Sequence, residues 1–286
     1  MIFIIKNNLL KFVFSLTFSC LMISSCGETG CTDQMAENFN PNATEDDGSC
    51  VYMSHNCDAI ENFCLEINFQ HVIGNQNVIY ANDSIIYQNE QGTMYSVRRL
   101  LYVLSDITLF FEDELPLNSS DLIFINTDDV ETLSKTFDNL PSLCTGISFR
   151  LGLSTVNNID NFFVDFENDF HVLMLWPNLT AIGNNTFQGG YHYMKLEGKY
   201  INSEGQPNFY NTHTGPTNGM DFSNSHIFSF APSSSIFVTM NINNWYNNPI
   251  YDFNTFGSAI MDNDTAQSNL YENAIDVFSI ELDLKD

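Results

Sequence analysis

Positive charge is scarce in this chain of 286 residues. Only 9 Lys and Arg stand against 35 Asp and Glu, which gives a formal net charge of −26. A field of this sign repels the phosphate backbone of nucleic acids and anionic lipid headgroups. The composition therefore argues against nucleic-acid binding, and we expect no nucleic-acid partner.

Catalytic signatures are missing as well. The sequence contains no phosphate-binding loop, no G-x-S-x-G elbow, no H-E-x-x-H zinc motif and no G-x-G-x-x-G dinucleotide motif. Among 35 acids, no spacing marks two carboxylates as a glycosidase pair, so a hydrolase is the weakest interpretation. We expect a protein that is not an enzyme.

The chain has only one long apolar stretch. Residues 12–23 follow Lys6 and Lys11 and are too short to span a bilayer, a pattern typical of a secretory signal. The segment ends Ile23-Ser24-Ser25-Cys26, which resembles a bacterial lipobox and implies cleavage before a lipid-bearing cysteine. We expect a signal peptide at 1–25 and lipidation of Cys26. The lipid would be the sole membrane attachment, anchoring the protein to the outer membrane in the cell envelope, on its periplasmic or surface face. The alternative is a plain secreted protein cleaved elsewhere.

Seven cysteines are present, and two of them, Cys20 and Cys26, are assigned to the signal peptide and the lipid. The other five are Cys31, Cys50, Cys57, Cys64 and Cys144. An exported protein meets an oxidising compartment that permits disulfides, and no pair of C-x-x-C knuckles suggests zinc. Proximity favours Cys31 with Cys50 and Cys57 with Cys64. A bond from Cys144 to Cys57 or Cys64 remains open, because spacing does not determine connectivity.

An acidic segment lies between the lipid and the main part of the chain. The stretch GCTDQMAENFNPNATEDDGSCVY at 30–52 resembles a short cysteine-bracketed module found in many secreted and surface bacterial proteins. We expect residues 26–56 to form this linker module. Its oxygen-rich loop predicts a calcium site, for which the candidate ligands are Asn40, Asn42, Thr44 and Asp46. The alternative is a turn held by side-chain hydrogen bonds and the disulfide.

Residues 57–286 alternate apolar and polar side chains with a period of two, which predicts strands. The clearest examples are 278–284 and 65–71. Further expected strands are 97–111, 122–126, 147–151, 172–176, 191–197, 226–230 and 236–242. Short helices are expected at 244–253, where Pro249 interrupts, and at 264–274. Together these segments predict an all-β fold, an antiparallel β-sandwich with minor short helices.

Histidine and methionine share expected strand faces. His71 falls on the apolar face of its strand, and alternation places His192 on the same side as Met194 and Leu196. Neutral imidazole and soft thioether are ligands that suit copper. The alternative is that each histidine is a hydrogen-bonded core residue.

Five motifs follow one another in order: SVRRLLYVLSDITLF at 96–110, FRLGL at 149–153, MLW at 174–176, GGYHYMKLEGKY at 189–200 and FYNTHTG at 209–215. Together they resemble the MbnP-like copper-binding family. The resemblance implies an exported β-sandwich protein that holds copper with histidines and an oxidatively modified tryptophan. It also implies a partner, a di-haem enzyme of the MauG type that some members are encoded beside.

Carried over by position, Trp176 matches the family tryptophan and His213 the histidine of H-x-G. Some members have a histidine two residues after the tryptophan, where this chain has Asn178. We expect His192 or His71 to replace it, and rank His171 lower because its parity on a strand at 172–176 is opposite to that of Trp176. The predicted metal site thus comprises His213, Trp176, His192, Met194 and His71. Lys195, Glu197 and Gly198 are interpreted as structural.

These observations predict an exported lipoprotein that binds copper. The alternative is a β-sandwich module without metal that recognises a glycan or a protein at the cell surface through exposed Tyr, Trp and Asn-rich loops.

Overall fold

The computed structural model describes residues 28–33, 36, 38–50, 63–80, 84–184 and 186–283. The chain divides into two compact units, Met1–Tyr52 and Met53–Asp286. The expected signal peptide, the lipidation site Cys26 and the disulfide partner Cys57 lie outside the described residues.

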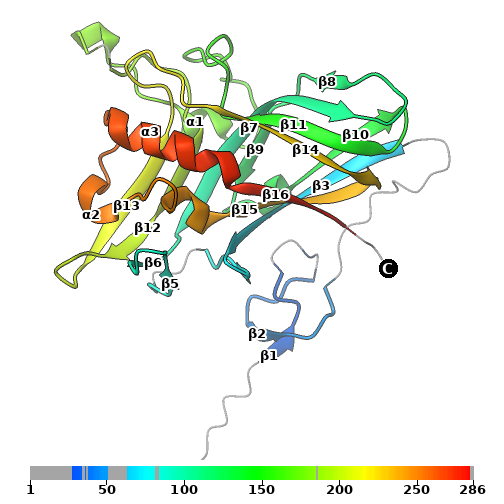
Figure 1. Cartoon of the computed structure of the whole chain (residues 1–286), viewed down its shortest axis with the longest axis horizontal. Coiled ribbons are helices and arrows are strands. Elements are labelled where there is room, and N and C mark those ends of the chain that lie inside the picture. Colours follow the sequence, from blue (N-terminus) through cyan, green and yellow to red (C-terminus); the bar gives the residue numbers. More distant parts are fainter. Residues whose placement is uncertain are drawn as a thin grey trace, which may run out of the picture. The chain divides into compact units, whose positions relative to one another are not determined.

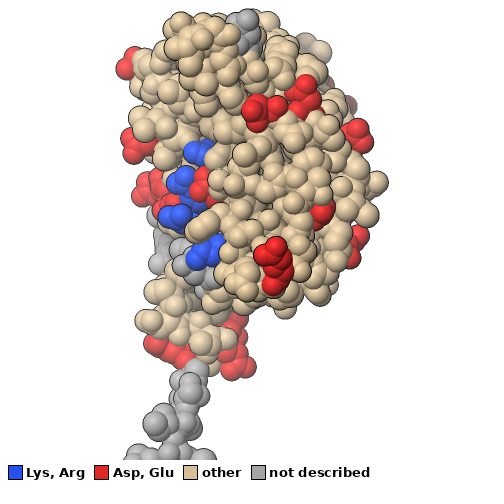
Figure 2. All heavy atoms as spheres, turned by 90° about the vertical axis from the view of Figure 1, so that its left-hand side faces the viewer, with Lys and Arg blue, Asp and Glu red and all other residues tan. Residues whose placement is uncertain are grey.

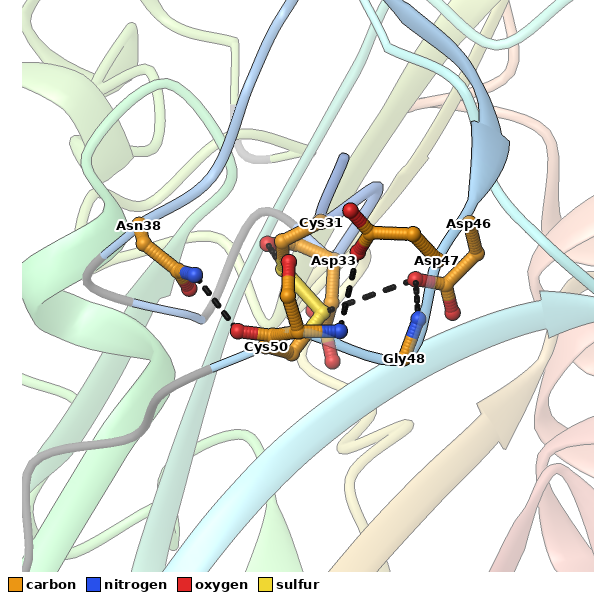
Figure 3. Close-up of a disulfide and its surroundings, with 8 residues drawn as sticks. Cys31, Asp33, Asn38, Asp46, Asp47, Gly48 and Cys50 are labelled. Atoms are coloured by element: carbon orange, nitrogen blue, oxygen red, sulfur yellow. Dashed lines mark hydrogen bonds between the residues drawn. A yellow bond between two sulfur atoms is a disulfide. The ribbon is translucent and has the colours of Figure 1, made fainter. Parts of the chain in front are cut away.

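The first unit is a small loop structure closed by one disulfide. Strands β1 (Glu28–Gly30) and β2 (Ala43–Asp46) pair in parallel. Cys31 and Cys50 are joined with an S–S distance of 2.08 Å, which confirms the predicted pairing (Figure 3). Cys64, in the second unit, is also disulfide-bonded, whereas Cys144 is free and buried.

The described residues of the second unit form two β-sheets (Figure 1). The larger sheet has the order β14-β11-β7-β12-β6-β5, with β13 paired to β12 and with β8 and β9 paired to β7. Its strands are β5 (Tyr87–Gln88), β6 (Met94–Tyr95), β7 (Arg99–Phe110), β8 (Leu117–Ser119), β9 (Ile123–Asn126), β11 (Cys144–Leu151), β12 (Met194–Ile201), β13 (Pro207–Thr214) and β14 (Asn224–Ser233). The smaller sheet has the order β10-β3-β15-β16, with β4 paired to β3. Its strands are β3 (Phe63–Ile73), β4 (Gln76–Asn77), β10 (Ser134–Leu140), β15 (Ser235–Asn241) and β16 (Phe278–Leu282).

Side chains from the two sheets meet in a common core. His71 on β3 lies 3.2 Å from the hydroxyl of Tyr102 on β7, measured from Nε2. Phe278 on β16 contacts the rings of Tyr102 and of Phe149 on β11, with centroids 6.0 and 5.3 Å apart. All pairings in these sheets are antiparallel except that of β3 with β15. The predicted β-sandwich is therefore confirmed.

Helices are few and short in the described part of the chain. The α-helices are α1 (Phe170–Met174), α2 (Phe253–Phe256) and α3 (Asp264–Asn273), and 3₁₀ helices cover Val130–Leu133, Thr180–Ile182, Ile242–Tyr246 and Ala274–Asp276. Helix α3 begins where Asn263 accepts a hydrogen bond from the Ala266 backbone N–H, a side-chain N-cap. None of the described helices is long and apolar enough to cross a membrane.

One expected strand is wrong. Residues 172–176 do not form a strand, because the chain enters helix α1 at Phe170 after Asp169 adopts a left-handed backbone conformation with φ of 55°. Phe170 and Met174, one helical turn apart, are both buried in a cluster with Phe124 and Tyr191. The four-residue spacing of these two core residues fits a helix, and it decides the local structure against the alternation of apolar and polar residues that suggested a strand.

Candidate metal centre

Trp176 follows helix α1 and is completely buried. Its backbone N–H donates to the carbonyl of Gly190 at 2.8 Å, which ties this segment to the chain leading into β12. A Cβ at Gly215 would lie 2.5 Å from the indole ring, so only glycine allows the backbone after β13 to approach it. The indole Nε1–H is buried and has no hydrogen-bond partner within the described residues.

His192 packs against this indole, with ring centroids 4.7 Å apart. Its Nδ1 lies 3.0 Å from the carbonyl oxygen of Met174. A carbonyl only accepts hydrogen bonds, so Nδ1 carries the proton and Nε2 of the neutral ring holds a lone pair. That Nε2 is buried and without a hydrogen-bond partner in the described part of the chain.

His213 reaches the same place from β13. Its ring lies 5.2 Å from that of His192 and nearly perpendicular to it, at 87°. Nε2 lies 2.9 Å from Oε1 of Glu197, which in turn accepts two hydrogen bonds from Arg99 at 2.9 and 3.2 Å. Gln267, on α3, donates to the backbone carbonyl of His213 at 2.8 Å and holds that segment of β13.

Burial lowers the pKa of both imidazoles and so favours their neutral form. Burial, and then the positive charges that His213 and Lys195 can carry, hold the pKa of His192 well below its ordinary 6.5. Burial also lowers the pKa of His213, although Glu197 opposes it. Burial would raise the pKa of Glu197, but hydrogen bonds from His213 and Arg99 prevail and lower it to about 2. The Glu197 carboxylate is therefore an acceptor, so His213 donates through Nε2 and keeps its lone pair on Nδ1.

The structure brings together three of the predicted residues, namely Trp176, His192 and His213. We call these three the Trp–His cluster. The expectation that His192 shares a face with Met194 is wrong, because the chain bends at Tyr193 before β12 begins and the alternation is broken there. His213 pairs directly with Lys195, which places Met194 on the opposite, buried face of the β12–β13 ladder.

The other two candidate histidines lie in different surroundings. His71 bonds to Tyr102, and burial lowers its pKa to about 3. Tyr102 pairs across the strands with Met194, so His71 and Met194 both belong to the core between the sheets. His171 lies on helix α1, and its Nδ1 is 2.9 Å from the Tyr191 hydroxyl. Because this segment is a helix, alternation along a strand does not determine which way His171 faces relative to Trp176.

Sequence reasoning missed how the cluster is supported. Glu197 was interpreted as a structural, ion-paired residue, and the structure shows that it also orients His213. Strand β13, which presents His213, was not expected, because apolar and polar side chains do not alternate clearly in PNFYNTHT. Asn178 is exposed and bonds to Asp160 and Thr180.

The acidic loop of the first unit is a turn held by side-chain hydrogen bonds, and not an arrangement of free oxygen ligands around a calcium position. Asn40 accepts a hydrogen bond from the Asn42 backbone N–H at 3.0 Å, and Asp46 accepts one from that of Gly48 at 3.1 Å. Asp47 likewise accepts from the Ser49 backbone N–H at 2.9 Å (Figure 3). These carboxylate and amide oxygens satisfy backbone donors within the loop, so the calcium expectation has no support. Across the described ranges, no group of three or more His, Cys, Asp or Glu side chains is placed to hold a metal ion.

Fold and cluster together define a β-sandwich protein with a tryptophan and two neutral histidines packed beside its larger sheet. The sequence model of the MbnP family matches residues 63–262, and the chain belongs to this family. Among solved structures, MbnP from Methylosinus trichosporium is similar, with a TM-score of 0.52 at 10% identity over 78% of this chain and 100% of that chain. At this identity the likeness shows a shared fold. No curated protein matches the sequence.

Proposed function

We propose that this protein binds copper, as Cu(I), at the Trp–His cluster. The observation that supports the proposal is the lone pair on Nε2 of His192, which is buried and unpartnered within the described residues. A buried polar atom of this kind is costly unless something binds it. His213 offers a second lone pair on Nδ1, and its ring is adjacent.

The donor set fits Cu(I) better than other ions. Imidazole suits copper, and Cu(I) accepts few ligands and has a single charge, so a site with two neutral ligands and little water suits it. Glu197 and Arg99 would act as the outer partners that fix the orientation of His213. The net charge of −26 would raise the concentration of cations near the surface without providing specificity.

Trp176 is the proposed site of oxidative modification, and a di-haem enzyme of the MauG type is the proposed partner that oxidises it. Its position against His192, with Nε1 unpartnered in the described part of the molecule, supports this assignment. The intact mass of the peptide containing Trp176 tests it. Native protein should carry an oxidised indole, and recombinant protein made without the enzyme should carry an unmodified one. An unmodified indole in native protein would contradict the assignment.

Copper binding is tested by anaerobic loading with Cu(I) followed by competition with a chromophoric chelator. His192→Ala and His213→Ala should each lower the Cu(I) affinity at least about tenfold, since even the loss of an outer partner has an effect of this size. His171→Ala is the matched control, because this histidine bonds to Tyr191 outside the cluster and its loss should leave the affinity unchanged.

Two results would overturn the proposal. If the wild-type protein retains no stoichiometric Cu(I) against a weak competitor, recognition of a glycan or protein without metal becomes the better interpretation. If copper is retained but neither cluster variant weakens it, the site lies elsewhere.

The protein is further proposed to be exported and lipid-anchored at Cys26, on the basis of the Ser24-Ser25-Cys26 sequence after an apolar segment. Mass spectrometry of the mature N-terminus tests this. A chain that begins at another residue, or that has no acyl mass on Cys26, would refute the anchor.

A further inference from the structure

Charged side chains are sparse over much of the surface of this protein. They make up only 15% of the chain, and Figure 2 shows a face with wide areas that carry none. Such areas can recognise a ligand only through hydroxyl, amide and apolar groups. One pocket of about 260 Å³, beside strand β7, offers these groups. We call it the Asp106 pocket, and the residues of its lining that matter here are Ser105, Asp106, Ser120, Asp121, Asn157 and Phe162.

Strand β7 is irregular where it borders the pocket. The register of its pairing with β11 shifts between Ser148 and Arg150, so β7 contains one extra residue at this point. Asp106 lies in this bulge with a φ of 51°, a left-handed conformation that is uncommon for a residue with a side chain. The preceding residue, Ser105, is buried, and its hydroxyl donates to the Gly152 carbonyl at 2.7 Å. A bulge redirects a side chain, and here the exposed side chain is that of Asp106.

The two carboxylates of the lining are already paired with cations. Arg150 Nε lies 2.7 Å from Oδ2 of Asp106, and Lys135 Nζ lies 2.8 Å from Oδ2 of Asp121. The second oxygen of each carboxylate accepts no hydrogen bond from a described residue, and the two side chains are 42% and 41% exposed. A cationic ligand would therefore gain little charge interaction here, and an anionic one would be repelled. The spare oxygens suit the O–H donors of a neutral ligand.

Two uncharged polar side chains add to these acceptors. Ser120 and Asn157 line the pocket, are exposed, and make no side-chain hydrogen bond to a described residue. A hydroxyl and an amide can each donate and accept hydrogen bonds. Together with the carboxylate oxygens, they match a ligand that carries several hydroxyl groups.

An aromatic ring completes the lining. Phe162 is 59% exposed, and its ring centroid lies 4.9 Å from that of Phe163, with the two planes at 87°. Phe163 in turn packs on the buried rings of Phe170 and Tyr191, at 5.6 and 5.3 Å. Its backbone N–H also donates to the Tyr191 hydroxyl at 2.8 Å. Phe162 is thus an exposed apolar ring that the core holds in position through its neighbour.

We propose that the Asp106 pocket binds one pyranose ring of a neutral glycan. The C–H face of a sugar ring is apolar and would pack on Phe162. The sugar hydroxyls would bond to the polar side chains of the lining, namely Asp106, Asp121, Ser120 and Asn157. The pocket volume of about 260 Å³ lies just below the ~300–1,000 Å³ of sites for drug-sized ligands and therefore suits a single ring. None of these residues belongs to the Trp–His cluster, and neither proposal depends on the other.

The test uses metal-free full-length protein and ligand-observed saturation-transfer NMR with neutral probes. The probes are the methyl glycosides of glucose, galactose, mannose, xylose and N-acetylglucosamine, together with sorbitol, an open-chain polyol without a ring. We expect at least one glycoside to bind with millimolar affinity and sorbitol to bind at least about fivefold more weakly, because only a ring presents a flat face to Phe162. Added salt should leave the affinity nearly unchanged, because the ligand has no charge.

Three variants and one matched control locate the site. Phe162→Ala should weaken the best glycoside about fivefold through loss of the aromatic contact. Ser120→Ala and Asn157→Ala should each weaken it about threefold through loss of a hydrogen bond. All three side chains are exposed, so the melting temperature should not change. Phe209→Ala is the control, because Phe209 is 63% exposed on β13 outside this pocket and its loss should leave the affinity unchanged.

The proposal is overturned if no glycoside of the panel binds, or if sorbitol binds as tightly as the best glycoside. It is also overturned if Phe162→Ala and Phe209→Ala have the same effect, because the sugar would then bind elsewhere. Since the experiment contains no copper, its outcome is independent of the Cu(I) competition.

Discussion

Glu197 offers a quantitative test of how the Trp–His cluster is held. Its pKa is lowered from the ordinary 4.5 to about 2 by His213 and Arg99. At about 1.4 kcal/mol per pKa unit, this shift corresponds to about 3 kcal/mol of stability as an upper value. The side chain is 15% exposed and Arg99 is 26% exposed, so solvent screening reduces the expected value to about 2 kcal/mol.

The sign of the pH dependence follows from the direction of this shift. A carboxyl whose pKa is lower in the folded state stabilises the fold above its unfolded pKa, and this contribution is lost as pH falls toward the folded value. Glu197→Gln should therefore lower the free energy of unfolding by about 2 kcal/mol at neutral pH and by only about half as much near pH 3.

The measurement is urea unfolding of wild type and Glu197→Gln at both pH values. The control is Glu112→Gln, since Glu112 is an exposed carboxylate without an ion-pair partner among the described residues, and this substitution should have almost no effect at either pH. A difference between wild type and Glu197→Gln that is the same at both pH values would refute the electrostatic account.

Three further results are expected. Gly215→Ala should lower the free energy of unfolding by about 1–3 kcal/mol in thermal or urea melts, because the new methyl group would overlap the indole of Trp176; an unchanged stability would contradict the packing. The Cu(I) affinity should stay constant as pH falls through 6.5, the ordinary histidine pKa, and should decline only at lower pH, because burial lowers the pKa of both cluster imidazoles. Cu(I) titrations at a series of pH values test this, and a loss of affinity centred at 6.5 would place copper on exposed histidines. Cys50→Ala should disrupt the first unit and leave the melting of the second unchanged, as monitored by Trp fluorescence, because the disulfide lies within the first compact unit and both tryptophans belong to the second; a lower melting temperature of the second unit would contradict this expectation.

Much of the fold could be predicted because its strands have one buried face. In β3, Leu65, Ile67, Phe69 and His71 are all buried, as period-two alternation predicts. The alternation rule failed where the backbone departs from a regular strand. Helix α1 replaced the strand expected at 172–176, and the bend at Tyr193 turned His192 away from the face of Met194. Neither irregularity has a marker such as Pro or Gly at the position where it occurs.

The Trp–His cluster could be found from the sequence only through its resemblance to a family, because its members come from three separate segments of the chain. Trp176 follows a helix, His192 precedes β12 and His213 lies on β13. The pattern of apolar and polar residues in one segment shows which face of that segment a residue occupies. Which residues of two segments meet depends on the register of strand pairing, and here Lys195 on β12 pairs with His213 on β13. The same register brings Glu197 within reach of His213 and, across β12 and β7, places it opposite Arg99. Glu197 therefore belongs to the motif for a physical reason: its single carboxylate orients a cluster histidine on one side and binds an arginine on the other.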